Sequence, residues 1–168
     1  MQMKKLAVAM VTGVLSTALV TAPVNAQEMR PVLSAASAQT IVDGCRDYAE
    51  GKGWNLNIAV LDQGRNLQAF LRMDDAPLGS IEIAQWKANA TASFPRATKG
   101  TAERARDFPA LAAAPNIAIF EGGEAIFTQD GVHIGGVGVS GAAGSEDAEC
   151  ARAGIAAAGL AHSRVEND

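Results

Sequence analysis

Aromatic residues, histidine and cysteine are all scarce in this chain of 168 residues. Aromatic side chains make up 5% of the sequence, and there are two histidines and two cysteines. The cysteines are far apart, and the chain contains neither a CxxC pair nor an HExxH segment, which excludes the common zinc-binding motifs. His133 and Ser140 lie on one predicted strand at an odd spacing, so they point to opposite faces and cannot form a hydrolase pair.

Basic residues are also sparse, and no run of lysine and arginine occurs. The formal net charge is −4 at pH 7. Nucleic acids and anionic membranes attract positively charged surfaces, so this charge balance argues against both as partners.

The first 26 residues are predicted to be a secretory signal peptide. Lys4 and Lys5 supply its positive start, residues 6–20 are uncharged, and residues 24–26 (Val-Asn-Ala) have the small-x-small pattern of a cleavage site. An uncharged run of about 15 residues is short for a membrane span, which needs roughly 20, so a retained anchor is the less favoured alternative. Cleavage would leave a mature chain that begins at Gln27 and works in the periplasm or outside the cell. Removal of the two lysines takes the formal charge from −4 to −6.

Cys45 and Cys150 are open to two interpretations. An oxidising compartment would allow a disulfide between them. Otherwise each cysteine is a small buried apolar residue.

The mature chain, residues 27–168, is predicted to be one α+β domain. Apolar residues at helical spacing indicate helices over 34–50, 79–94 and 145–161, with a short helical piece around Glu103. Alternating segments joined by tight turns indicate hairpins and a mainly antiparallel five-stranded sheet with helices layered on it. The predicted strands are Asn55–Leu61, Asn66–Met73, Asn116–Phe120, Ala125–Thr128 and Val132–Ser140.

The segment 134–141 is rich in glycine. Glycines let backbone N–H groups approach an anion, but the segment lacks the lysine of a P-loop and the spacing of the dinucleotide fingerprint. The alternation of Val137 and Val139 favours a strand instead. In such a strand, glycines such as Gly138 permit the close approach of a helix or a ligand.

Other candidate binding residues lie where predicted elements end or meet. Arg72, Met73 and Asp74 follow the second strand, where Arg72 can hold a carboxylate through two parallel hydrogen bonds or pair with Asp74. Lys87 can bind an anion where a helix meets the sheet, or extend to solvent. Asp147 and its acidic neighbours can bind a cation, although the helix dipole also explains acidic residues at the start of a helix.

Four segments together resemble the GlcG/HbpS family of haem-binding, DUF336-type domains. IAVLDQGRNL at 58–67, with LRMD at 71–74, is similar to the first family signature. SIEIAQWKA at 80–88 is similar to the family's helix, and IGGVGVSG at 134–141, followed by EDAECA at 146–151, is similar to its last segments. The segments occur in the family's order, and the likeness covers about residues 33–160.

This resemblance implies a profilin-like layered fold and homo-oligomers, often octamers. Haem binding, in some members with haem degradation, is the best-known activity of the family. The resemblance therefore implies an exported haem-binding, haem-degrading or iron-sequestering protein with haem as its cofactor. The rival hypothesis is a small-molecule enzyme or carrier that acts on a carboxylate or enolate, and a third is a structural subunit of an oligomer. The rival would use Arg72, Asp74, Lys87 and Ser140.

Under the haem hypothesis, we expect one crevice between the first hairpin, the second helix and the last strand. Arg72 or Lys87 would contact a propionate, and His133 or Met73 would ligate the iron. Gly138 would let the ligand approach the sheet.

The implied layout also places the first and last helices side by side on one face of the sheet. A disulfide between Cys45 and Cys150 is therefore geometrically possible.

Overall fold

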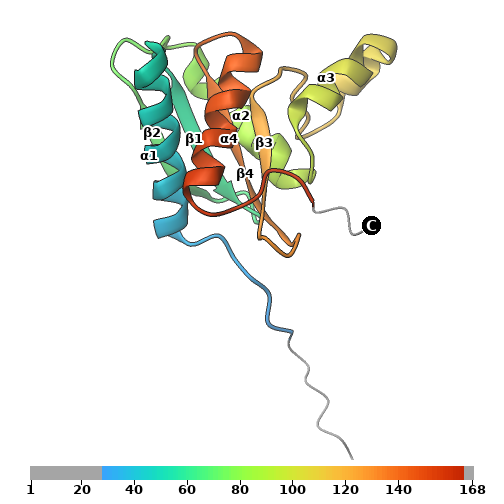
Figure 1. Ribbon diagram of the computed structural model, residues 1–168. Coiled ribbons are helices and arrows are strands. Elements are labelled where there is room, and N and C mark those ends of the chain that lie inside the picture. The colour runs from blue at the N-terminus through green and yellow to red at the C-terminus, as the bar shows by residue number, and fades with distance from the viewer. Residues whose placement is uncertain (1–27, 165–168) are drawn as a thin grey trace, which may run out of the picture.

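The computed structural model describes residues 28–164, so the predicted signal peptide lies outside the described residues. Figure 1 shows one four-stranded sheet with helices packed on both of its faces. The elements in chain order are α1 (Ala35–Lys52), β1 (Asn57–Asp62), β2 (Leu67–Arg72), α2 (Ser80–Ser93), α3 (Thr98–Asp107), a 3-10 helix (Pro109–Ala113), β3 (Gly123–Phe127), β4 (His133–Ser140) and α4 (Gly144–Ala157). No helix within residues 28–164 is long and apolar enough to cross a membrane.

The sheet has the strand order β2-β1-β4-β3, and every neighbouring pair is antiparallel. The α+β class and the hairpins β1-β2 and β3-β4 were therefore predicted correctly, whereas the hairpin expected between 116–120 and 125–128 is absent. The fifth strand, expected over Asn116–Phe120, is wrong, because this segment forms a loop. Asn116 has a left-handed backbone (φ 58°), and the adjacent residues Ile117 and Ala118 are both buried. A half-buried strand would bury alternate residues, so the apolar character of this segment reflects a packed loop.

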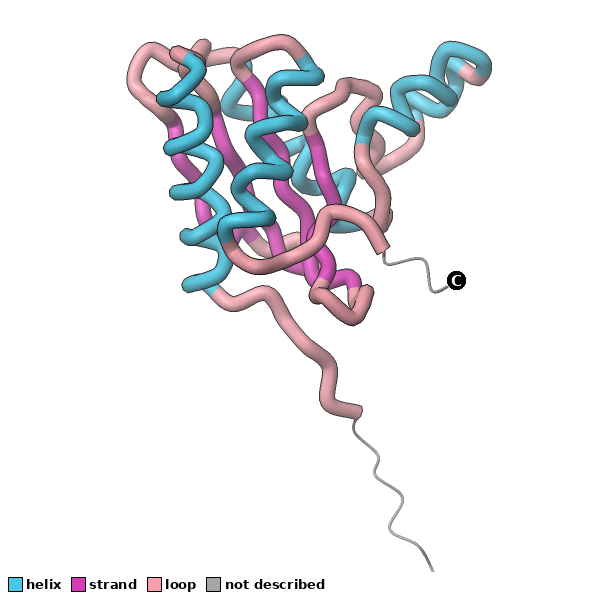
Figure 2. The backbone as a smooth tube through the Cα atoms, in the orientation of Figure 1, coloured by secondary structure: helices cyan, strands magenta, loops and turns pink. Residues whose placement is uncertain are grey.

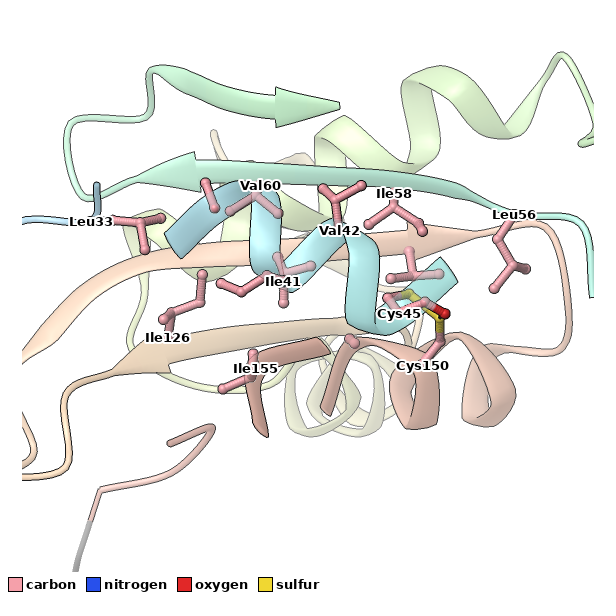
Figure 3. Close-up of a cluster of buried hydrophobic side chains, with 14 of the residues drawn as sticks. Leu33, Ile41, Val42, Cys45, Leu56, Ile58, Val60, Ile126, Cys150 and Ile155 are labelled. Atoms are coloured by element: carbon pink, nitrogen blue, oxygen red, sulfur yellow. A yellow bond between two sulfur atoms is a disulfide. The ribbon is translucent and has the colours of Figure 1, made fainter. Parts of the chain in front are cut away.

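One face of the sheet is covered by α1 and α4. Figure 2 shows these two helices in front of the strands, with α2 behind them. The buried stripe of α1 packs on the apolar side chains of β1 and β4, as Figure 3 shows for Ile41, Val42, Ile58 and Val60. Ser34 caps α1 as a helix start should, since the Ser37 N–H donates to its Oγ at 3.0 Å.

Cys45 and Cys150 form a disulfide that joins α1 to α4, with a Cα–Cα distance of 4.8 Å. Both residues are fully buried, and Figure 3 shows the bridge inside the apolar core. The two helices approach closely because glycines face the contact. A Cβ on Gly154 would overlap the Ile41 carbonyl oxygen.

The other face of the sheet is covered by α2. A small satellite core joins Ala84, Ala88 and Ala92 of this helix to Ala59 and Leu61 of β1. Small residues on both sides bring the helix backbone close to the strands, which decides how much room is left for a ligand.

The C-terminal segment leaves α4 earlier than predicted. The helix ends at Ala157, not near Ala161, and Gly159 has a left-handed backbone (φ 68°). The chain then turns back to β3, where Phe127 and Ala161 exchange two backbone hydrogen bonds of 2.8 and 2.9 Å. This bridge holds residues 162–164 beside the edge of the sheet.

Candidate functional site

The first candidate site is a cavity of about 350 Å³ at the end of β2, called here the Arg72 cavity. Arg72, Met73 and Asp74 line it together, as their adjacency in the sequence suggested. An Arg72 guanidinium nitrogen donates to the Ala76 carbonyl oxygen at 3.4 Å. The remaining lining residues are Arg46, Glu50, Asn55 and Leu71.

Arg46 in this cavity is already engaged by carboxylates of its own helix. It lies 2.8 Å from Asp43, 2.8 Å from Asp47 and 3.9 Å from Glu50. An anion entering the Arg72 cavity therefore finds Arg72 as the guanidinium with fewer competing partners.

The second site is a cavity of about 330 Å³ above the end of β4, called here the Lys87 cavity. It brings Lys87 and Ser140 together with Asp147, whose role sequence analysis missed. Lys87 is neither a surface residue nor a free cation: its Nζ donates to the Val139 carbonyl oxygen at 2.7 Å and to Asp147 Oδ2 at 2.8 Å. The cavity is lined by Ile83, Lys87, Phe120, Glu121, Ser140, Ala142, Gly144 and Asp147.

Burial is the main influence on the Asp147 carboxyl and raises its pKa. The Lys87 ammonium and the Ala142 N–H oppose that rise, because both favour the charged carboxylate. The sequence signal for this pair was present, since both residues lie in the segments that carry the family resemblance. The helix dipole alone explains an acidic residue at this position, so no local pattern points to Lys87 as the partner of Asp147.

The expectation of a single crevice is wrong, because the two cavities share no lining residue. Asn57 of β1 lies between Arg72 and Ser140 in the sheet register. Its side chain is buried, and its amide donates to the Pro77 carbonyl oxygen and to Ser80 Oγ at 3.0 and 3.1 Å. The start of α2 is thereby fixed over the sheet where the crevice would have continued.

Gly138 does not provide room for a ligand. A Cβ at this position would overlap the Ala84 carbonyl oxygen and the Ala88 backbone nitrogen of α2. Of the two interpretations of the glycine-rich strand, the structure selects the close approach of a helix.

His133 lies at the opposite end of β4 from Ser140 and lines neither cavity. It is half-buried, with its Nε2 3.0 Å from the Thr91 carbonyl oxygen and its ring centroid 5.4 Å from that of Phe127. Burial lowers the pKa of this imidazole. The structure therefore does not place His133 beside Arg72 or Lys87, as an iron ligand in one crevice would require.

The third site is a groove of about 640 Å³ at the edge of β3, called here the Arg96 groove, which sequence analysis missed entirely. Arg96 enters from the loop after α2, and Arg164 lies over the Phe127 ring, 6.0 Å from its centroid. Gly159 is the sequence signal that could have predicted the groove. A glycine there ends the last helix, so the residues after it can turn back toward the sheet. The lining residues are Pro95, Arg96, Ala97, Glu124, Phe127, His162, Ser163 and Arg164.

The Arg96 groove is rich in positive charge. Within residues 28–164, neither Arg96 nor Arg164 forms an ion pair. Glu124, its one acidic lining residue, is buried and lies 2.7 Å from Arg152. Burial raises the pKa of the Glu124 carboxyl, and Arg152 opposes that rise.

Comparison with known proteins identifies the family to which the chain belongs. A family model described as haem degrading protein HbpS-like matches residues 33–156. The chain belongs to the HbpS-like family. Protein GlcG of Escherichia coli strain K12 is 40% identical over 110 residues, which are 65% of this chain and 81% of GlcG.

Solved structures of HbpS and of PduOC have the same fold. The crystal structure of HbpS is 30% identical, with a TM-score of 0.73 over 82% of this chain and 97% of the HbpS chain. A PduOC:heme complex is 24% identical, with a TM-score of 0.73 over 80% of this chain and 100% of the PduOC chain. At that level of identity, the PduOC likeness concerns the fold alone.

Proposed function

We propose that the protein is an exported haem-binding protein and that haem binds in the Arg96 groove. The observation that carries this proposal is the convergence of two guanidinium groups and an exposed imidazole on one open groove. Membership of the HbpS-like family supports the ligand class, and the PduOC:heme complex is a haem-bound example of the same fold.

Haem has three requirements, and the groove residues fit each of them. The macrocycle is large and apolar, and a groove of about 640 Å³ lined by Pro95 and Ala97 offers it more room than either cavity. Its two propionates are anions, for which Arg96 and Arg164 provide bidentate donors. Its iron takes a nitrogen or sulfur ligand, which His162 would supply.

His162 fits the role of iron ligand better than His133 does. His162 is exposed and lines the groove, whereas the Nε2 of His133 is hydrogen-bonded to the backbone of α2. The bridge between Phe127 and Ala161 fixes the backbone immediately before His162, so its position does not depend on a free tail.

The Arg72 cavity is the alternative haem site, because it pairs Arg72 with the Met73 thioether. It has about half the volume of the groove, and Met73 packs against the core. Arg46 is held by three carboxylates, so this cavity has less positive charge to offer two propionates.

Export is supported by the sequence of residues 1–26 and by the disulfide. Structural disulfides persist in oxidising compartments such as the periplasm or the medium. Intact-mass measurement of the protein from culture fractions tests this part of the proposal. A chain that begins at Gln27 is expected, and a cell-associated chain that keeps Lys4 and Lys5 would overturn it.

Self-association is the remaining part of the proposal. In the described part of the chain, β2 is an edge strand with no partner on one side, and it exposes Leu67 and Phe70. Exposed apolar side chains at a sheet edge favour pairing with another chain. We expect a homo-oligomer, up to the octamer that the family resemblance implied, and light scattering measures its mass.

A hemin titration tests the haem site directly. Wild-type protein is expected to bind hemin saturably with a red-shifted, sharpened Soret band. A linear, non-saturating titration would overturn the haem proposal. Saturable binding that depends on Arg72 and Met73, but not on the groove residues, would retain haem and move it to the Arg72 cavity.

A further inference from the structure

The Lys87 cavity contains hydrogen-bond donors that have no partner within the described residues. Lys87 Nζ carries three protons, and two of them are used by Val139 and Asp147. Ser140 is 6% exposed and lines the cavity, yet its hydroxyl forms no hydrogen bond within the described residues. The hydroxyl oxygen is accessible from the cavity, so it is free to bond to a ligand there.

Backbone donors lie at the same place. The first turn of α4 begins at Gly144, which lines the cavity, and the first backbone N–H groups of a helix have no partner inside it. No side chain caps this helix end, although Glu146 bonds back to the Ala143 N–H at 3.0 Å. The positive end of the α4 dipole therefore faces the cavity.

The Asp147 carboxylate, in contrast, already has a partner at each oxygen. Asp147 Oδ2 accepts from Lys87, and Oδ1 accepts from the Ala142 N–H at 3.1 Å. Glu121 lies 3.5 Å from Lys99. Lys99 offsets the charge of Glu121, and the unused donors of Lys87, Ser140 and the start of α4 favour an anionic ligand.

Apolar side chains form the rest of the enclosure. Ile83 and Phe120 line the cavity, and Trp86 packs edge-on against Phe120 with ring centroids 5.7 Å apart. Both aromatic residues are 44% exposed, so an aromatic pair stands beside the opening instead of being buried in the core.

We infer that the Lys87 cavity binds a small carboxylate with an apolar or aromatic substituent. Its carboxylate accepts hydrogen bonds from Ser140, from Lys87 and from the first turn of α4. Its apolar part lies against Ile83 and Phe120. This site is separate from the Arg96 groove and does not depend on haem binding.

Phenylacetate is a suitable probe, and phenylacetamide is its uncharged counterpart. The mature exported protein, which begins at Gln27, is labelled with ¹⁵N and titrated with each compound, and its backbone amide resonances are followed. Phenylacetate is expected to shift the signals of residues 140–144 saturably, and the amide to bind at least about tenfold more weakly, because hydrogen bonds to a charged acceptor are the stronger ones.

Ser140→Ala is the decisive variant, since Lys87→Met removes a buried ion-pair partner and endangers folding. Ser140→Ala should weaken phenylacetate binding about tenfold, the range expected for one hydrogen bond to a charged group. Ser163→Ala, in the Arg96 groove, is the matched control and should leave phenylacetate binding unchanged. Equal binding of the acid and the amide, the absence of saturable shifts, or undiminished binding by Ser140→Ala would overturn the inference.

Discussion

Lys87 Nζ lies 2.8 Å from Asp147 Oδ2, and the two side chains are 3% and 2% exposed. Lys87 belongs to α2 on one face of the sheet and Asp147 to α4 on the other, so the pair joins the two helical layers at the end of β4. Gly122, with a φ of 115°, lies against it: a Cβ there would come within 2.6 Å of Lys87 Nζ. Sequence elements from three parts of the chain thus meet at one buried ion pair.

Breaking this pair by one substitution should be strongly destabilising. Lys87→Met leaves the Asp147 carboxylate buried without its cation, a situation that costs about 3–5 kcal/mol of unfolding free energy. Asp147→Asn should also destabilise, because it leaves the Lys87 ammonium buried without its anion and has one amide oxygen for two donors, Lys87 and the Ala142 N–H. Urea unfolding at neutral pH measures both variants, and a Lys87→Met protein as stable as wild type would show that the pair carries no stability.

A second prediction concerns the packing of α2 on the glycine-rich strand. Gly138→Ala should lower the unfolding free energy by at least about 2 kcal/mol, because backbone atoms of α2 occupy the space of the new methyl group. Gly100→Ala in α3 is the matched control. Nothing lies within 4 Å of its Cβ position, so alanine should stabilise the helix by about 0.5–1 kcal/mol.

If Gly138→Ala unfolds at the wild-type urea concentration, α2 does not seal the sheet as described. The ligand interpretation of the glycine-rich strand would then be reopened.

Local patterns predicted most of the fold. Ser34 and Gly53 mark the two ends of α1, and the Gly-containing turn after Asp62 joins β1 to β2, because these signals act over a few residues. The false strand at 116–120 arose because burial in a loop and burial in a strand both select apolar side chains. Their difference lies in backbone conformation, which a single sequence encodes weakly.

The candidate site was predicted only in part, for a related reason. Arg72, Met73 and Asp74 share a cavity because they are adjacent, whereas the pairing of Lys87 with Asp147 depends on contacts between residues far apart in the chain. The Arg96 groove depends on where the C-terminal segment crosses β3. No periodic pattern of apolar residues within a short segment predicts where two distant segments cross.

The disulfide provides a third prediction. Replacing both Cys45 and Cys150 by alanine should lower the unfolding free energy by about 2–5 kcal/mol, since the bridge closes a long loop in the unfolded chain. A reductant should destabilise the wild type to a similar extent and leave the double variant unaffected. An unchanged melting temperature in the double variant would show that the helix contact alone suffices.

The fourth prediction is a pH dependence that follows from His133. Burial lowers its pKa below the ordinary value, so the unfolded chain binds a proton more readily than the folded protein does. Its contribution to stability is present above the unfolded pKa of about 6.5 and is lost as the pH falls through the lower folded value. The His133 contribution to the unfolding free energy should therefore decline from about pH 7.5 to about pH 5.5, while the raised pKa values of Asp147 and Glu124 act in the opposite direction.

His133→Gln should reduce that decline. Urea unfolding of the wild type and the variant at both pH values makes the comparison. Equal slopes for wild type and His133→Gln would rule out His133 as the titrating group.

The last prediction separates the two haem locations by paired substitutions. Arg96→Ala and Arg164→Ala should each weaken hemin binding about tenfold, because each removes a charged hydrogen-bond donor from a propionate. Arg72→Ala should have little effect, because Arg72 lines a different cavity. His162→Ala should move the Soret band by removing the iron ligand, while His133→Ala should leave its position unchanged. The reverse pattern, with sensitivity to Arg72 and indifference to Arg96, Arg164 and His162, would place haem in the Arg72 cavity.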